Sequence, residues 1–315
     1  MKTQKWIFVT GTPRSSTTFV GRVLSIPLEI DYLHEPFNPY CGVPGIDRLY
    51  LYMNERTPSF PHYKQIIENV FNHEFTLKTG YFKEDSPWRT VVKSVIGSRS
   101  AWSARLIKFN PFHTTMVVKD PIGCLLTEYL YQHYGVRPVI TIRHPIGVVS
   151  SALRLKWNMS LDPIRQQREL VEDYFLDEQQ FLAAESTDPI ERAAALWRAL
   201  NKVLFSQAER HPSWLLVVHE HLSANPIEQF RNLYKALELP WSPKIEKKVS
   251  NLTRMKNPVA APTGKVHELR RNSRELFQHS LKRLSREQRQ KVYEITKDVA
   301  LNVYSKESFQ LDDEE

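Results

Sequence analysis

The segment from Trp6 to Leu24 constrains the fold of this chain more than any other. The continuous apolar run Trp6–Thr10 predicts a buried strand, and Gly11 and Pro13 predict a tight loop directly after it. Apolar residues at helical spacing then predict a helix over residues 15–25, which Pro27 ends. A strand that leads through a tight loop into a helix is typical of α/β proteins.

Similar apolar runs recur along the chain, and helical patterns separate most of them. Further strands are predicted at residues 28–33, 90–96, 115–119, 138–142 and 214–218. Further helices are predicted at residues 145–157, 163–184, 189–209, 226–237 and 285–302, most with proline near the first turn. Near-continuous apolar strands that alternate with helices indicate a mainly parallel central sheet with helices on both faces. We therefore expect a three-layer α/β fold.

Composition narrows the class of protein further. The 315 residues are 41% hydrophobic and 25% charged, which is typical of a globular protein. No apolar stretch approaches the roughly 18 residues of a membrane span, and the first apolar run is too short for a signal peptide. We therefore expect a cytoplasmic protein without a membrane span. The two cysteines, Cys41 and Cys124, lack the spacing of a zinc site or a disulfide framework, so we expect reduced thiols and no metal.

The net charge of +8 favours anionic partners. Much of this charge lies between Lys265 and Lys291, a segment that contains nine lysines and arginines but only three glutamates. Such a run is commonly a solvated helix face, and nucleic acid is an alternative partner. Neither interpretation explains the motifs found elsewhere in the chain, so we do not expect nucleic acid as the partner.

The loop after the first strand has the features of an anion site. Between a strand and a helix, backbone N–H groups and the positive helix end converge on a phosphate, and hydroxyls add donors. The segment Gly11–Thr18 has four hydroxyls in a row at its end. Compared with the ATP-binding loop GxxxxGK[ST], Ser16 replaces the second glycine and Thr17 replaces the lysine, while the basic residue comes earlier at Arg14.

This loop resembles the GxPRSGTT signature of sulfotransferases, which bind the 5′-phosphosulfate of 3′-phosphoadenosine 5′-phosphosulfate (PAPS). The resemblance implies that the whole loop contacts PAPS and its product PAP: Gly11, Thr12, Pro13, Arg14, Ser15, Ser16, Thr17 and Thr18. Ser16 stands where the family has glycine, so its backbone is strained if that position needs a positive φ. A plain N-capped helix is the structural alternative.

A second motif begins at the end of the strand at 138–142. Arg143 is followed by His144 and Pro145, and Ser151 lies eight positions after the arginine. This resembles the R(D/N)P element of the same family, in which the arginine and a serine eight positions later hold the 3′-phosphate. The spacing is physically sound, because helical side chains lean towards the N-terminus and an arginine binds phosphate bidentately.

Further matches extend the resemblance over most of the chain. Residues 33–39 look like the EPF segment of bacterial and carbohydrate-directed sulfotransferases, and residues 117–121 look like their (K/R)DP segment. Residues 217–226 resemble a YEDL...NP stretch in which His219 stands where tyrosine is usual, and the resemblance makes it a nucleotide contact. Residues 251–283 lie where the family has a loop that closes over the 3′-phosphate. That leaves Lys265, Arg270 and Arg271 as candidate ligands, without a choice among them.

The resemblance implies a single sulfotransferase domain over residues 1–315 with a P-loop-like fold, in which residues 37–113 form an insertion that shapes the acceptor pocket. The expected activity is sulfuryl transfer from PAPS to a hydroxyl, with a carbohydrate or glycolipid as the acceptor. Another small molecule is the alternative acceptor, and the oligomeric state is not predicted. An ATP-dependent small-molecule kinase and a non-enzymatic polyanion binder are the alternative functions.

The resemblance and the chemistry of transfer assign catalytic roles. Arg14 is expected to stabilise the charge that grows on the leaving group, and Lys119 to assist at the transferring group. Asp120 follows Lys119 where the phenol and hormone sulfotransferases have a histidine, so the general base is expected to be Glu35. Glutamate suits this role if burial raises its pKa towards neutrality, and His34 is the neighbouring alternative.

Overall fold

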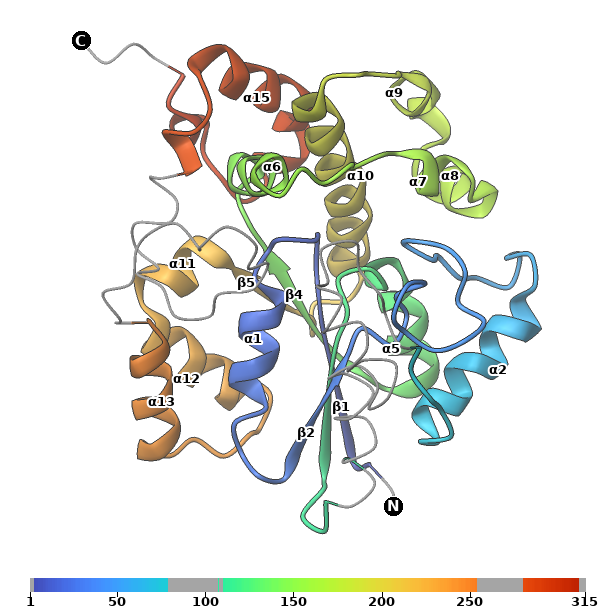
Figure 1. Cartoon of the computed structure of the whole chain (residues 1–315), viewed down its shortest axis with the longest axis vertical. Helices are drawn as coiled ribbons and strands as arrows, with labels where there is room; N and C mark the ends of the chain where they lie inside the picture. The colour runs from blue at the N-terminus through green and yellow to red at the C-terminus, as the bar shows by residue number, and fades with distance from the viewer. Residues whose placement is uncertain (1–2, 79–106, 108–109, 254–279, 312–315) are drawn as a thin grey trace, which may run out of the picture. The chain divides into compact units, whose positions relative to one another are not determined.

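The computed structural model describes residues 3–78, 107, 110–253 and 280–311 (Figure 1). Within these residues, one sheet has the strand order β2-β3-β1-β4-β5. The strands are β1 (Lys5–Thr10), β2 (Ile30–His34), β3 (Thr115–Lys119), β4 (Arg137–Ile142) and β5 (Leu215–Val218). β3 pairs in parallel with both β1 and β2. The prediction of an α/β fold with a mainly parallel sheet is confirmed, and the strand predicted at 90–96 lies outside the described residues.

The predicted helices around the two motifs are confirmed with small changes at their ends. They are α1 (Thr17–Leu24), α6 (Pro145–Arg154), α10 (Pro189–Arg210), α12 (Pro226–Ala236) and α15 (Arg286–Ala300). In addition, the structure contains α2 (Phe60–Phe71), α5 (Thr127–Tyr134), α11 (His219–Ala224), α13 (Pro243–Thr253) and the short turns η1 (Cys124–Leu126) and η4 (Lys306–Phe309). None of the described helices has the length and apolar character needed to cross a bilayer.

The prediction of one helix over residues 163–184 is wrong. The segment is broken into α7 (Asp162–Arg165), α8 (Arg168–Tyr174), η2 (Leu176–Glu178) and α9 (Gln179–Ala183). The first break lies at Gln167, whose backbone is extended with φ −106° and ψ 92°. Its buried side chain turns back and donates from Nε2 to the Pro163 carbonyl over 2.8 Å. This side-chain hydrogen bond competes with continuation of the helix.

Contacts divide the chain into two compact units, and residues 1–10 and 17–139 make up the first. Its core contains one buried residue from each of the three parallel strands, Phe8, Leu33 and Met116, together with Ile67 of α2 and Leu130 of α5. The buried residues of α2 recur every three or four positions, which is the spacing of one helix face. The strand register aligns the last residues of β2 and β3, so the residues that follow them lie at the same edge of the sheet.

The second unit contains residues 11–16 and 140–315. Its centre is α10, which packs against α15 and α6 and has Trp197 and Leu200 among its buried residues. Figure 1 shows α10 beside α15, and α12 beside α13. By its contacts, the loop at residues 11–16 belongs to this unit. The unit also contains Arg143, at the end of β4, and the start of α6. The single domain over residues 1–315 stays a prediction.

Candidate functional site

The loop at residues 11–16 has a backbone that is bent at three positions. Gly11 has φ +137°, and a Cβ there would lie 2.1 Å from the Thr141 carbonyl oxygen, so no other residue fits without displacing β4. Arg14 and Ser16 both have φ 76°. Alternation of right-handed and left-handed backbone turns successive N–H groups towards one centre, which suits an anion. Ser15 secures the loop, because its Oγ lies 2.7 Å from Thr141 Oγ1.

Ser16 shows the strain expected for a serine in the glycine position of the signature, since its φ is positive. Holding a non-glycine residue in this region costs about 1–2 kcal/mol. A hydrogen bond of 2.9 Å between Ser16 Oγ and His219 Nδ1 stabilises the loop there. Burial, and then the charge of Arg143, hold the pKa of His219 well below its usual value, so the imidazole is neutral. His219 is thus in contact with the loop that the sequence assigns to the nucleotide.

The two motifs, far apart in the sequence, meet in the second unit. Arg14 Nε donates to Ser151 Oγ over 3.0 Å, and Arg143 Nη1 donates to the Arg14 carbonyl over 3.1 Å. The Arg14 guanidinium also lies 5.3 Å from the ring centre of Trp157, a cation–π contact. Two guanidinium groups and a serine hydroxyl therefore gather beside a backbone suited to an anion. This arrangement provides the donors that a phosphate group requires.

Two residues of α10, which the sequence analysis did not single out, hold these motifs in place. Trp197 Nε1 donates to the Arg143 carbonyl over 3.0 Å, and Asn201 Nδ2 donates to Thr12 Oγ1 over 2.7 Å. Gly147 gives room for the arginine side chain, because a Cβ at this position would lie 2.7 Å from Arg143 Nε. Both α10 residues are buried in a predicted helix, where the sequence gives no sign that their polar atoms face a functional loop.

The first unit contains the other candidate group, centred on Glu35. Glu35 follows β2 with φ 48°, a left-handed conformation that is uncommon for glutamate. Its Oε1 forms an ion pair with Lys119 Nζ, at the end of β3, and its Oε2 accepts from Asn38 Nδ2 over 2.7 Å. Lys119 is 1% exposed. A buried lysine is stable in its charged form only beside a partner such as this carboxylate.

Asp120 is a further charged residue of this group, and it is fully buried. Its carboxylate accepts three backbone N–H bonds, from Phe37 over 2.7 Å and from Ile122 and Gly123 over 2.9 Å each. Asp120 therefore fixes the backbone that follows Glu35 as well as the turn after β3. Burial and the negative charge of Glu35 raise the pKa of Asp120 to about 7, against the effect of the backbone donors.

The expected rise in the pKa of Glu35 is not found. Burial raises the pKa of Glu35. Other effects outweigh burial and lower this pKa to about 2: the charges of Lys119 and His34, and the hydrogen bonds from Lys119 and Asn38. Glu35 is thus a carboxylate at neutral pH. His34 lies beside it, with 4.0 Å between His34 Nε2 and Glu35 Oε1, and its ring stacks on Tyr32 at 6.1 Å between ring centres.

Several other residues named in the sequence analysis are not part of these two groups. Lys265, Arg270 and Arg271 lie outside the described residues, as does much of the predicted insertion at 37–113. Within the described part of the chain, no cluster of His, Cys, Asp and Glu side chains is suited to a metal ion. Cys41 and Cys124 are both free and buried. Burial, and then the charges of Glu35 and Asp120, raise the pKa of Cys41 to about 12, and burial followed by Asp120 raises the pKa of Cys124.

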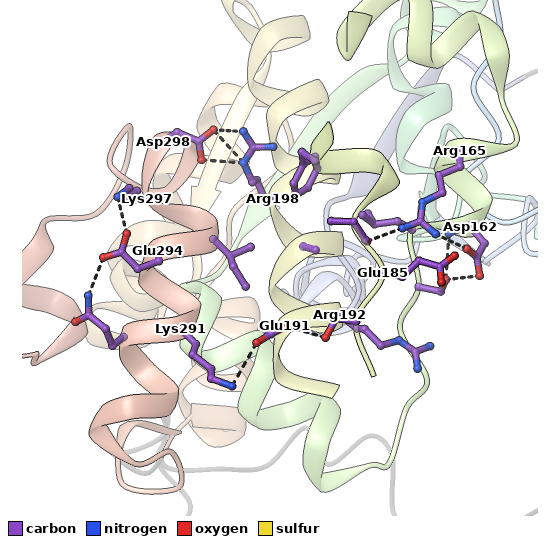
Figure 2. Close-up of a pocket in the computed structure, with 18 residues that line it drawn as sticks. Asp162, Arg165, Glu185, Glu191, Arg192, Arg198, Lys291, Glu294, Lys297 and Asp298 are labelled. Atoms are coloured by element: carbon purple, nitrogen blue, oxygen red, sulfur yellow. Dashed lines mark hydrogen bonds and ion pairs between the residues drawn. The ribbon is translucent and has the colours of Figure 1, made fainter. Parts of the chain in front are cut away.

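A cavity of about 880 Å³ lies between α10, α15 and the segment that carries α7 and α9 (Figure 2). Most of its charged side chains pair with one another or with a neighbour: Arg165 with Asp162, Lys291 with Glu191 and Asp188, Lys297 with Glu294, and Arg198 with Asp298. None of the described residues of the two motifs lines it. The candidate site is therefore the loop with Arg143 and Ser151, and not this cavity.

The sequence matches the model of the sulfotransferase family over residues 7–243. Among solved structures, it is similar to the sulfotransferase domain of the Synechococcus PCC 7002 olefin synthase, at 13% identity over 97% of each chain with a TM-score of 0.44. It is also similar to sulfotransferase STF9 from Mycobacterium avium, at 11% identity over 90% of this chain and 78% of that one, with a TM-score of 0.43. No curated protein sequence matches the chain. Because the family model spans well over half of its length, the chain belongs to the sulfotransferase family.

Proposed function

We propose that this protein transfers a sulfuryl group from PAPS to a hydroxyl of a carbohydrate or glycolipid. The observation that carries the proposal is the meeting of the two motifs. Arg14 contacts Ser151 through its side chain and Arg143 through its carbonyl, although 137 and 129 positions separate these pairs. A single anion site explains why residues so distant in the sequence share one set of hydrogen bonds.

In this proposal the nucleotide binds to the loop after β1 and to the residues that follow β4. The backbone and hydroxyls of residues 11–18 hold the 5′-phosphosulfate, and Arg143 and Ser151 hold the 3′-phosphate. The donor set fits such a ligand, because guanidinium groups and backbone N–H groups form short, charge-assisted bonds to phosphate oxygens. His219 supports the loop through Ser16, and we assign it this role in place of a direct contact with the nucleotide.

Arg14 stabilises the charge that develops on the bridging oxygen as the nucleotide leaves. Glu35 removes the proton of the acceptor hydroxyl. Its ion pair with Lys119 keeps it deprotonated, which is the state that a base requires, but also makes it a weak base at rest. We propose that Lys119 turns to the transferring sulfuryl group when the substrates bind. Loss of the ion pair then raises the pKa of Glu35 towards the value of an effective base.

The acceptor is proposed from the sequence between β2 and α2. The EPF segment at residues 35–37 is similar to that of carbohydrate-directed sulfotransferases. Its phenylalanine is buried in the core of the first unit, 6.3 Å from the ring centre of Phe8. Phe37 therefore supports the turn that holds Glu35, and the choice of a glycan rests on the resemblance of the segment as a whole.

Calorimetry with PAP and with ADP tests the nucleotide assignment. We expect PAP to bind at least tenfold more tightly, because ADP lacks the 3′-phosphate that Arg143 and Ser151 would contact. Equal affinity for the two, or turnover with ATP, would favour a kinase. Binding that falls steeply with salt and extends to any polyanion would indicate a non-enzymatic binder. A screen of hydroxylated glycans, glycolipids and phenols with labelled PAPS then identifies the acceptor class.

A further inference from the structure

The peptide bond between Arg143 and His144 is fixed at both of its polar groups. Trp197 donates to its carbonyl over 3.0 Å, and its N–H donates to Glu220 Oε1 over 3.1 Å. Glu220 lies in the short helix α11, and Trp197 lies in α10. Two elements distant in the sequence thus determine the direction in which the Arg143 side chain leaves the strand end.

Glu220 is in turn held by the C-terminal segment. Tyr304 donates from its hydroxyl to Glu220 Oε2 over 2.8 Å. Burial raises the pKa of Glu220, and the charge of Arg143 and the hydrogen bonds from Tyr304 and His144 oppose this rise. The two oxygens of Glu220 therefore connect Tyr304 with the backbone next to Arg143.

His144 completes the connection. Its Nδ1 accepts from the Ile146 N–H over 3.3 Å and so caps α6, the helix that carries Ser151. Because Nδ1 is an acceptor, the proton lies on Nε2, which donates to Ser308 Oγ over 3.0 Å. The ring lies 4.7 Å from that of Tyr304 and 4.4 Å from that of Phe309, which is fully buried. Residues 304–309 thus hold His144, which both caps α6 and directly follows Arg143.

We propose that Glu220, Tyr304 and His144 are positioning residues for Arg143, and that the C-terminal segment at residues 304–309 thereby sets the preference for a nucleotide with a 3′-phosphate. This inference rests on the proposed function, since it assumes that Arg143 binds that phosphate. An arginine binds a phosphate well only when its planar fork faces the oxygens at the correct angle. A backbone held on both sides provides that angle before the ligand arrives.

The test measures PAP and ADP affinities by calorimetry for the variants Tyr304→Phe and Glu220→Leu. We expect each to weaken PAP binding about threefold to tenfold and to change ADP binding less than about twofold. Glu220→Leu also tests the sign of the effect. Removal of a negative charge near Arg143 would by itself strengthen binding of an anion, whereas loss of positioning weakens it. Tyr293→Phe is the matched control, because it removes a hydroxyl from α15 beside Phe309 and leaves the contacts of Glu220 intact.

The same substitutions in an Arg143→Ala background show whether the residues act through Arg143. We expect Tyr304→Phe to have no further effect on PAP affinity there, since the group that it positions is gone. Equal losses for PAP and ADP, an additive effect in the Arg143→Ala background, or tighter PAP binding by Glu220→Leu would overturn the inference. If the unaltered protein does not distinguish PAP from ADP, the proposed function itself fails. Circular dichroism and the melting temperature of each variant identify a protein that has lost its fold.

Discussion

Arg14 and Ser151 are joined by a hydrogen bond of 3.0 Å from Nε to Oγ. The donor lies in a loop with a left-handed backbone, and the acceptor lies in α6, a helix capped by His144. One bond to Nε fixes the plane of a guanidinium and leaves its terminal nitrogens directed elsewhere. The pair therefore orients the Arg14 guanidinium, which we propose to stabilise the charge on the leaving group.

Substitution of Arg14 by lysine keeps the charge but loses the fixed plane. We expect kcat/KM to fall about 10-fold to 100-fold in Arg14→Lys and less in Ser151→Ala. The double variant should lose less than the product of the two, because the residues act together. Ser150→Ala is the matched control, since the buried Ser150 hydroxyl has no hydrogen-bond partner within the described residues. Independent, multiplicative effects would contradict the pairing.

Arg143→Ala should weaken binding selectively. Loss of a charge-assisted contact to the 3′-phosphate is expected to reduce PAP affinity about 10-fold to 100-fold, with ADP affinity within about twofold of the original value. Calorimetry with both nucleotides gives the ratio. Arg168→Ala removes an exposed arginine that pairs with Glu172 and serves as the control for a change of net charge. A parallel loss for ADP would remove Arg143 from the 3′-phosphate.

Glu35→Gln removes a carboxylate and keeps its shape. We expect kcat to fall about 10²-fold to 10⁴-fold, the range of general-base catalysis, while PAP affinity stays nearly unchanged. Glu74→Gln, at an exposed position in the same unit, is the control. Unchanged turnover in Glu35→Gln would exclude Glu35 as the base and direct attention to His34.

The ion pair of Glu35 also predicts how stability depends on pH. The pKa of Glu35 is lowered from the ordinary 4.5 to about 2, with burial opposing and Lys119 the largest cause in favour. The unfolded chain therefore binds a proton more readily, so the pair stabilises the fold fully above pH 4.5 and loses its effect as pH falls towards 2. The shift corresponds to about 3 kcal/mol. Melting temperatures between pH 5 and 2 should fall less steeply in Glu35→Gln than in the unaltered protein, and parallel curves would refute the assignment.

Ser16 offers a test of backbone strain. Its positive φ favours glycine, but its hydroxyl contacts His219. Ser16→Ala loses the hydrogen bond and keeps the strain, whereas Ser16→Gly loses the bond and relieves the strain. We expect the glycine variant to have a free energy of unfolding about 1 kcal/mol higher than the alanine variant. Urea unfolding of the two variants measures the difference, and an alanine variant as stable as the glycine one would show that the loop carries no strain.

The sequence predicted the described strands and the motif helices well, because buried strands and capped helices leave local patterns. Met116, Val117 and Val118 form a continuous apolar run at the centre of β3, and Pro145 and Pro189 mark the starts of α6 and α10. The break at Gln167 was not predictable, since it depends on where one amide side chain finds an acceptor. A local sequence pattern does not indicate which acceptor a polar side chain will bind.

The sequence predicted which residues belong to the candidate site better than it predicted how these residues interact. The spacing of Arg143 and Ser151 indicated a shared ligand, and the structure brings both to Arg14. The partners that fix them, Trp197 and Glu220, come from elements whose sequence indicates only a buried helix or a polar turn. The pKa of Glu35 depends on the competition between burial and a lysine from another strand, and the sequence does not show which effect is larger.

The two buried cysteines have a practical consequence. With pKa values raised by burial, Cys41 and Cys124 remain protonated at neutral pH, and a protonated thiol reacts slowly with alkylating reagents. A cysteine introduced at an exposed position, as in Leu28→Cys, would carry nearly all of the reactivity. The chain with this one substitution is therefore ready for attachment of a single fluorescent dye, without prior removal of its two native cysteines.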